Sequence, residues 1–345
     1  MDMKRKFPGS KSRIRVIKLS LFNLLLGLSV LLVFFTVYLW HQSLPSYSHE
    51  VIPVFPETEA GEESLLKGGE AGATPWSGWW WPFYEKSPPH LYDPGGPMDK
   101  YDQVSVARGR PNPGAMAWEK RNHFTDKEEE GWFGHCNGWA AAAVLEPEPK
   151  SGKKVSGINF EVNDIMGLLS EWHWFDGAVA FYGTRYYGEG DNIDDILPHE
   201  FHYVIINYIG KQGRPLIMDI RGGTEEKDDP QVWNFPAYKY ELAYHVDDKD
   251  PEITHVRCRI WFCDFTRPTS LKFKNFTRDY YYRIKGEKIK PTSGEWETAK
   301  EGGWGSSGDS RKSHPDFLWY PGEAKHHPIL ERSQYLEIVG QGENR

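Results

Sequence analysis

The chain of 345 residues contains only three cysteines, Cys136, Cys258 and Cys263. An odd number leaves at least one thiol unpaired, so the sequence lacks the disulfide framework of a small secreted domain. Cys258 and Cys263 lie in a stretch that has the composition of a strand, Val256 to Cys263. Five residues of strand span about 16 Å, whereas a disulfide requires Cα atoms within about 7 Å. We therefore predict that these two cysteines are not bonded to each other.

No Cys/His cluster has the spacing of a metal site, so the sequence predicts no thiolate zinc site and no required metal or cofactor. Two acidic stretches, residues 224–230 and 245–251, contain oxygen ligands that suit calcium. Neither stretch has the spacing of an EF-hand loop. Solvated loops are therefore the favoured interpretation, and calcium binding is the alternative.

Positive charge is concentrated in the first 18 residues, which hold seven Lys or Arg and one acid. Without this leader the net charge of −8 becomes −14, which argues against a nucleic acid partner. Residues 19–40 contain no charged side chain, and 22 residues are enough to span a bilayer core as a helix. The basic flank predicts a single-pass signal-anchor with a cytoplasmic N-terminus and an extracellular, periplasmic or lumenal remainder. A cleaved signal peptide is the alternative.

Composition divides the rest of the chain into two regions. Residues 41–74 are rich in Pro, Gly, Ser and Glu, with six acids against one lysine, which is typical of a solvated stalk. Residues 75–345 are dense in aromatic side chains and long enough for one globular domain. Four tryptophans within residues 76–81 open this domain. They either line a substrate cleft or pack in the core, and packing is favoured because aromatic side chains contribute mostly through burial.

The most informative segment is residues 131–145, in which Cys136 stands between Gly134 and Gly138 and precedes a run of alanines. Alanine is the best helix former and the two prolines of residues 146–149 end the helix, so we expect a short helix with Cys136 at its first turn. The unpaired N–H groups and the positive end of the dipole favour a thiolate there. A buried structural thiol is the alternative. The glycines, which leave room for a substrate carbonyl near the backbone, favour a nucleophile.

A cysteine nucleophile requires a base, and the base requires a residue that fixes its tautomer. Residues 201–208 and 215–220 resemble two strands joined by a Gly-Lys-Gln-Gly loop, which predicts a hairpin. In this hairpin His202 lies opposite or diagonal to Asp219, within the reach of a cross-strand pair. We therefore predict a catalytic triad of Cys136, His202 and Asp219.

Other histidines fit the role of the base less well. His135 is adjacent to Cys136 in sequence, and neighbouring side chains on a helix diverge. His199 and His173 are kept as alternatives to His202. The structural interpretation of His202 and Asp219 is a surface histidine and a strand-end aspartate without a catalytic role.

The segment from Trp132 to Ala140 resembles the nucleophile segment of the transglutaminase elicitor family. The resemblance covers most of residues 75–321 and includes residues 75–82, 201–202, 216–219, 231–236 and 313–319. It implies a papain-like core with protein-glutamine γ-glutamyltransferase activity, in which Cys136 is the nucleophile, His202 the base and Asp219 the orienting residue. The predicted membrane anchor departs from a secreted elicitor, so a role in triggering defence does not carry over.

We therefore predict an α+β fold in which a short buried helix carrying Cys136 packs on an antiparallel sheet. The predicted function is a transglutaminase that forms a thioester with a glutamine side chain and transfers the acyl group to an amine, so its partners would be glutamine- and lysine-bearing proteins. We expect Trp132, Gly134, Asn137 and Trp81 to contact the substrate. A cysteine peptidase or amidase with the same triad, and a non-catalytic tryptophan-rich binding module, are the alternatives. Exclusion of water by the tryptophans favours transfer over hydrolysis.

Overall fold

The computed structural model describes residues 61–185, 195–220, 231–322 and 326–340. The basic leader, the apolar segment 19–40, most of the predicted stalk and the acidic stretch 224–230 lie outside these residues. The membrane anchor therefore stays a prediction. Among the helices that the structure describes, none combines the length and the apolar character needed to cross a bilayer.

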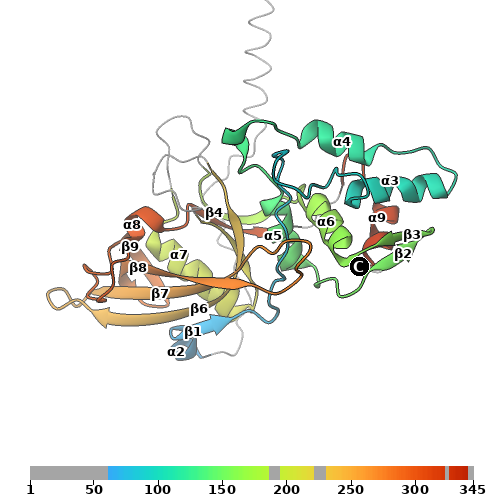
Figure 1. Ribbon diagram of the computed structural model, residues 1–345. Coiled ribbons are helices and arrows are strands. Elements are labelled where there is room, and N and C mark those ends of the chain that lie inside the picture. Colours follow the sequence, from blue (N-terminus) through green and yellow to red (C-terminus); the bar gives the residue numbers. More distant parts are fainter. Residues whose placement is uncertain (1–60, 186–194, 221–230, 323–325, 341–345) are drawn as a thin grey trace, which may run out of the picture. The chain divides into compact units, whose positions relative to one another are not determined.

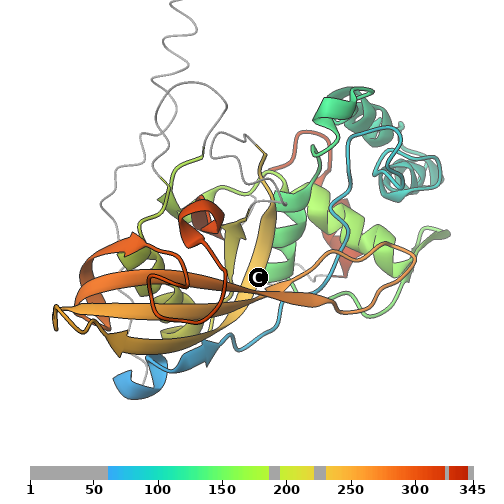
Figure 2. The ribbon, with the colours of Figure 1, turned by 60° about the vertical axis from the view of Figure 1, so that its left-hand side comes forward.

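The described chain is built around an antiparallel sheet of eight strands in the order β4-β10-β5-β6-β7-β8-β9, with β1 paired to β6 (Figure 1). Its strands are β1 (Gly68–Glu70), β4 (Ala178–Gly183), β5 (Leu216–Asp219), β6 (Asn234–Val246), β7 (Ile253–Cys263), β8 (Asn275–Glu287), β9 (Lys290–Trp296) and β10 (Phe317–Pro321). Figure 2 shows the long strands β6, β7 and β8, coloured tan to orange, running side by side. A second sheet consists of β2 (Lys153–Val155) and β3 (Ile158–Phe160).

Strand β7 shows why this sheet forms. Val256, Cys258, Ile260 and Phe262 are buried, and the residues between them are less buried. Successive side chains of a strand point to opposite faces, so this alternation places one face of β7 in the core. All three cysteines of the chain are free, as predicted for Cys258 and Cys263.

The helices are short, and one of them packs directly on the helix that carries Cys136. They are α2 (Glu62–Leu65), α3 (Pro97–Ala107), α4 (Ala115–Asn122), α5 (Cys136–Leu145), α6 (Val162–His173), α7 (Pro198–Ile205), α8 (Ser310–Ser313) and α9 (Arg332–Val339). A 3-10 turn spans Glu128–Glu130, and a π-helix, Ile206–Lys211, continues α7. Helix α6 packs against α3, α5 and α9.

Helix α5 begins at Cys136 and ends at Leu145, as the alanines and the following prolines predict. One side of the helix packs on α6, and another packs on β5, β6 and β10 (Figure 1). Its alanines, residues 140–143, are at most 5 % exposed, so their small side chains let both neighbours approach closely. The predicted combination of helices with an antiparallel sheet, and of a buried Cys136 helix packed on that sheet, is confirmed.

The predicted end of the stalk at residue 74 is wrong. Strand β1 pairs with β6, and Tyr240 on β6 donates its hydroxyl to the backbone oxygen of Leu65. Gly68 and Gly69, which suggest a flexible linker in the sequence, are needed for this packing. A Cβ on Gly69 would lie 2.7 Å from the ring of Tyr240 and 2.8 Å from Cα of Gly210. The folded unit therefore includes residues 62–70.

We expect Gly69→Ala to lower the free energy of unfolding by about 1–3 kcal/mol, because an added methyl group overpacks this contact. Chemical denaturation measures the change. Gly72→Ala is the matched control, since its nearest neighbour is the backbone oxygen of Gly213 at 3.6 Å. Equal stability of the two variants would contradict the packing of β1 on β6.

The predicted hairpin of residues 201–208 and 215–220 is also wrong in its first half. Residues 198–205 form α7, whereas 216–219 form β5 as expected. Pro198 is well suited to the first helical turn, and the buried residues Phe201, Val204 and Ile205 have the spacing of one helix face. This face packs on β8 and β9, so tertiary packing overrides the strand preference of the β-branched residues.

Candidate functional site

The thiol of Cys136 lies where the start of α5 meets the ends of two paired strands, β5 and β6. Its Sγ is 3.6 Å from the backbone oxygen of Val232 and 3.7 Å from Nδ2 of Asn234. Cys136 is 5 % exposed. At the start of a helix the backbone N–H groups have no partner inside the helix, so this position favours negative charge.

Asn234 is held so that its amide group faces the thiol. The indole Nε1 of Trp319 on β10 donates to Oδ1 of Asn234 at 2.8 Å, which leaves Nδ2 to donate to Cys136. Asn234 also pairs with Asp219 across β5 and β6, and a carboxylate oxygen of Asp219 accepts the backbone N–H of Trp233 at 2.6 Å. Three neighbouring strands, β10, β5 and β6, thus position the groups around the thiol.

Burial raises the pKa of the Cys136 thiol above its usual value, and the hydrogen bonds from Asn234 oppose this shift in part, while the charge of Asp219 adds to it. This result differs from the lowered pKa expected from the helix start alone. Burial raises the pKa of Cys263 to about 12 and that of Cys258 well above its usual value. Desolvation therefore outweighs the helix dipole at Cys136.

The structure does not bring His202 together with Cys136 and Asp219. The Nε2–H of His202 donates to the backbone oxygen of Lys288 at 2.8 Å, and Nδ1 accepts the hydroxyl of Tyr282 at 2.8 Å. The side chain is fully buried, and burial lowers its pKa to about 4. The predicted pair with Asp219 is wrong, because residues 198–205 are helical and direct His202 toward β8. Both ring nitrogens are occupied, so the geometry argues against His202 as the base.

Neither alternative base is hydrogen-bonded to the thiol in the described structure, and Nδ1 of His199 is buried without a hydrogen-bond partner there. His173 contacts Asp176 and Glu146 through its two ring nitrogens. His199 lies in the first turn of α7, the same short helix as His202. His135 faces Glu171 on α6, so it diverges from the thiol as expected. Among the described residues, no histidine is hydrogen-bonded to Cys136.

The four residues predicted to contact the substrate differ in how accessible they are. Trp132 and Asn137 are partly exposed, which is compatible with a substrate contact. Gly134 leaves no space for a substrate, because a Cβ there would lie 2.4 Å from the ring of Trp80. Trp81 is 2 % exposed, so its side chain belongs to the core.

Trp79, Trp80 and Trp233 are partly exposed tryptophans that lie close to one another. The ring centroids of Trp80 and Trp233 are 5.2 Å apart, and those of Trp79 and Trp80 are 5.9 Å apart. Trp233 precedes Asn234, and Trp80 fills the space over Gly134. An aromatic cluster thus lies next to the residues that flank Cys136. The favoured packing interpretation holds for Trp76 and Trp81, which are buried.

Sequence reasoning assigned no role to Asn234 or Trp319. Both lie in segments that carried the family resemblance, residues 231–236 and 313–319. This resemblance is the feature of the sequence from which they could have been identified as site residues. Their contact with each other depends on the pairing of β5 with both β6 and β10. Local sequence patterns do not contain that information.

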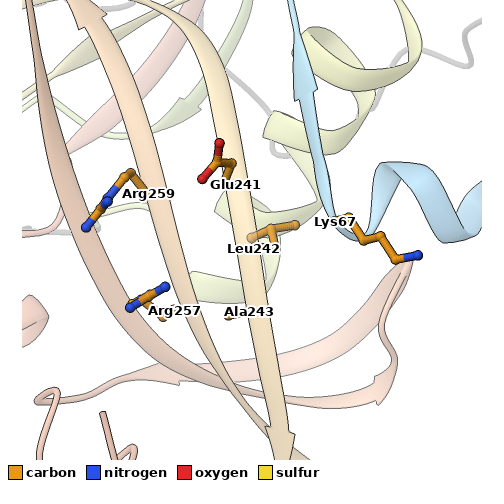
Figure 3. Close-up of a pocket in the computed structure, with 6 residues that line it drawn as sticks. All are labelled: Lys67, Glu241, Leu242, Ala243, Arg257 and Arg259. Carbon is orange, nitrogen blue, oxygen red and sulfur yellow. The ribbon is translucent and has the colours of Figure 1, made fainter. Parts of the chain in front are cut away.

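Two groups of side chains have the composition of metal ligands. Glu119, His123, His135 and Glu171 are buried together, and Asp195, His314 and Asp316 form a second group. A pocket of a different kind is lined by Lys67, Glu241, Leu242, Ala243, Arg257 and Arg259, on β6, β7 and the turn before β1 (Figure 3). Its lining contains neither a thiol nor a histidine, so we place no chemistry there.

Comparison with known proteins shows a family resemblance and a shared fold. Residues 126–257, which include Cys136, Asp219 and Asn234, match the model of the transglutaminase elicitor family, and this confirms the resemblance inferred from the sequence. The crystal structure of the GP42 transglutaminase from Phytophthora sojae is similar, with a TM-score of 0.59, 19% sequence identity and coverage of 82% of this chain and 93% of that chain. At this identity the likeness shows the fold. No curated protein matches the chain.

Proposed function

We propose that this chain, whose residues 126–257 match the model of the transglutaminase elicitor family, is a protein-glutamine γ-glutamyltransferase with Cys136 as its nucleophile. The observation that carries the proposal is the contact between the Cys136 thiol and the Asn234 amide at the start of α5. Three protein features meet there: a nucleophilic atom, a fixed side-chain donor and the unpaired backbone N–H groups of a helix start. Together they suit acyl transfer through a tetrahedral intermediate.

The reaction proceeds in two steps. Sγ of Cys136 attacks the carboxamide carbon of a glutamine side chain, the C–N bond breaks, and ammonia leaves with the thiol proton. The nitrogen of a lysine side chain then attacks the thioester, the C–S bond breaks, and the thiol regains a proton from the amine. In each step negative charge develops on the carbonyl oxygen, where Asn234 Nδ2 and the backbone N–H groups of α5 are available as donors.

Each step moves a proton to or from the sulfur. Asp219 is the ionisable group whose charge acts on Cys136. His202 does not carry this proton in the described geometry, because its ring nitrogens are both hydrogen-bonded elsewhere. The partly exposed cluster of Trp79, Trp80 and Trp233 would keep water from the thioester, which favours an amine as the acceptor.

A non-catalytic binding module is the second candidate function. It is favoured by the burial of Cys136, which raises the pKa of the thiol, and by the lack of a hydrogen-bonded histidine among the described residues. In that case the tryptophan cluster would be the binding surface and the thiol a structural one.

The test is incorporation of a labelled primary amine into a glutamine-bearing protein by the purified chain. We expect incorporation by the wild type and a loss of essentially all of it in Cys136→Ala, because no thioester forms without the thiol. Cys263→Ser is the matched control, since serine retains the donor that Cys263 directs at the backbone oxygen of Pro75.

The outcomes separate the candidates. Ammonia release with conversion of glutamine to glutamate, and no amine incorporation, would identify a hydrolase. If the folded wild-type protein gives neither amine incorporation nor glutamate, the chain is not an acyltransferase or hydrolase of this kind, and the binding module is the remaining candidate. Incorporation that survives in Cys136→Ala would contradict the assignment of the nucleophile.

A further inference from the structure

Behind the Cys136 site lies a buried cluster of two carboxylates and two imidazoles, which we call the Glu/His cluster: Glu119, His123, His135 and Glu171. Glu119 lies on α4, His123 follows the end of α4, His135 precedes α5, and Glu171 lies on α6. None is more than 7 % exposed. One potential ligand atom of each lies within 4.8 Å of the others.

The closest approaches in the Glu/His cluster link all four side chains. His135 Nε2 lies 2.6 Å from a carboxylate oxygen of Glu171 and 3.5 Å from one of Glu119. His123 Nδ1 lies 2.7 Å from a carboxylate oxygen of Glu119 and 3.9 Å from one of Glu171. Both histidines therefore direct a nitrogen at both carboxylates, toward one common point.

The tautomer of His135 places a lone pair at this point. Nδ1 of His135 lies 3.3 Å from the backbone oxygen of Trp81, which can only accept, so Nδ1 carries the hydrogen. In the neutral ring Nε2 is then an acceptor, and it faces the Oε2 of Glu171. These two atoms are buried and do not meet the geometry of a hydrogen bond with any partner in the described structure. Two acceptors this close require either a second proton on the His135 ring or a metal cation between them.

A fifth residue, His327, behaves as a supporting residue of a metal site. Its Nδ1 accepts the backbone N–H groups of Ile329 and Leu330 at 3.1 and 2.9 Å, so its hydrogen is on Nε2. This Nε2–H donates to Oε1 of Glu171 at 2.8 Å. One oxygen of Glu171 is therefore held from outside, and the other is left for the centre of the cluster, as second-shell residues do for metal-binding carboxylates.

Aromatic rings enclose the Glu/His cluster. Phe83 stacks on His123 with ring centroids 4.7 Å apart, and Trp174 lies edge-on to His135 at 4.9 Å. Two carboxylates in such surroundings are costly unless a positive charge compensates them. A divalent cation would neutralise both at once, and two histidines with two carboxylates form a ligand set typical of first-row transition metals rather than calcium.

We infer that Glu119, His123, His135 and Glu171 bind one divalent transition-metal ion, with tetrahedral zinc as the best fit to four protein ligands in a closed, buried site. The ion would join α4, the start of α5 and α6. Because His135 directly precedes Cys136, it would fix the position of the helix start that carries the thiol. Sequence reasoning predicted no metal site, since its local signal is only the spacing of Glu119 and His123, which places both on one helix face.

The test is the metal content of the purified full-length chain, measured by mass spectrometry after exposure to zinc and removal of unbound ions. We expect one zinc ion per chain in the wild type. In Glu171→Gln we expect at least a tenfold loss of affinity, because an amide oxygen is a weaker ligand, while the variant can still accept from His327 and donate to His135. The wild type should also unfold at a higher temperature with zinc than after chelation, because the ion binds the folded state, and this shift should vanish in Glu171→Gln.

His90→Gln is the matched control, since His90 is a buried histidine outside the cluster. Its zinc content should equal that of the wild type. Cobalt substitution adds a check that is independent of activity, because a tetrahedral site gives intense visible absorption. Wild-type chain that stays free of metal in excess zinc, cobalt or manganese would overturn the inference, as would zinc binding that persists unchanged in Glu171→Gln. If Glu171→Gln does not fold, the inference is tested on the wild type alone, by its metal content and by the visible spectrum of its cobalt form.

Discussion

Gly138→Ala is expected to lower the free energy of unfolding by more than about 3 kcal/mol, a large share of the about 5–15 kcal/mol that typically stabilises a domain. Gly138 lies in the first turn of α5, where the helix crosses α6. A Cβ at this position would lie 2.1 Å from the backbone oxygen of Ser170 and 3.0 Å from the backbone nitrogen of Trp174. Both are main-chain atoms of another helix or its cap, so a side-chain rotation cannot relieve the clash and the two helices must separate.

Urea denaturation at neutral pH measures this loss. Gly177→Ala is the matched control, because no atom lies within 4 Å of the Cβ that it would add. The control should be neutral or slightly stabilising, since alanine restricts the unfolded chain. If Gly138→Ala is as stable as Gly177→Ala, the close crossing of α5 and α6 is not present in solution, and the placement of Cys136 is in doubt.

His202→Gln is expected to remove up to about 3 kcal/mol of pH-dependent stability. Burial lowers the pKa of folded His202 to about 4, whereas an unfolded histidine has a pKa of about 6.5. Between these values the unfolded chain binds a proton that the folded chain does not bind. The contribution of His202 is therefore complete above about pH 6.5 and is lost as the pH falls through 4. Glutamine does not titrate, but it can still donate to the backbone oxygen of Lys288 and accept from Tyr282.

The measurement is the free energy of unfolding between pH 7.5 and pH 4 for the wild type and the variant. The curve of His202→Gln should be flatter over this window, and exposed His245→Gln should follow the wild type. Some pH dependence should remain in both, because burial also lowers the pKa of His123 to about 3. A variant whose stability falls as steeply as that of the wild type would show that His202 is not a buried neutral histidine.

The part of the fold that the sequence predicted correctly is local. Helix α5 follows from its alanines and from the prolines after it, and strand β7 follows from its composition. Helix α7 could not be predicted in the same way, because Val204 and Ile205 prefer strands and only their packing on β8 and β9 makes the segment helical. The glycines of β1 suggested a linker for a similar reason: the Tyr240 ring that requires them comes from a distant part of the chain.

Of the site, too, only the part that is encoded by neighbouring residues could be predicted. Cys136 was found because its helix start and alanine run are adjacent in sequence. The partners of the thiol are not, since Asn234 reaches it only through the pairing of β5 with β6, and Trp319 only through the pairing of β10 with β5. The base was misassigned because the His202–Asp219 pair depended on a hairpin that does not form. Long-range strand pairing, which local propensity does not encode, decides which side chains meet.

The most direct test of the role of Cys136 is the intact mass of the chain after incubation with a glutamine-containing peptide and no amine acceptor. A cysteine acyltransferase should accumulate a covalent adduct equal to the peptide without ammonia, located at Cys136 by fragmentation and released by hydroxylamine as a thioester. The account predicts this adduct in the wild type and in Cys263→Ser, and none in Cys136→Ala. An adduct of the same mass in Cys136→Ala, or amine transfer by wild-type protein that never carries the adduct at Cys136, would contradict it.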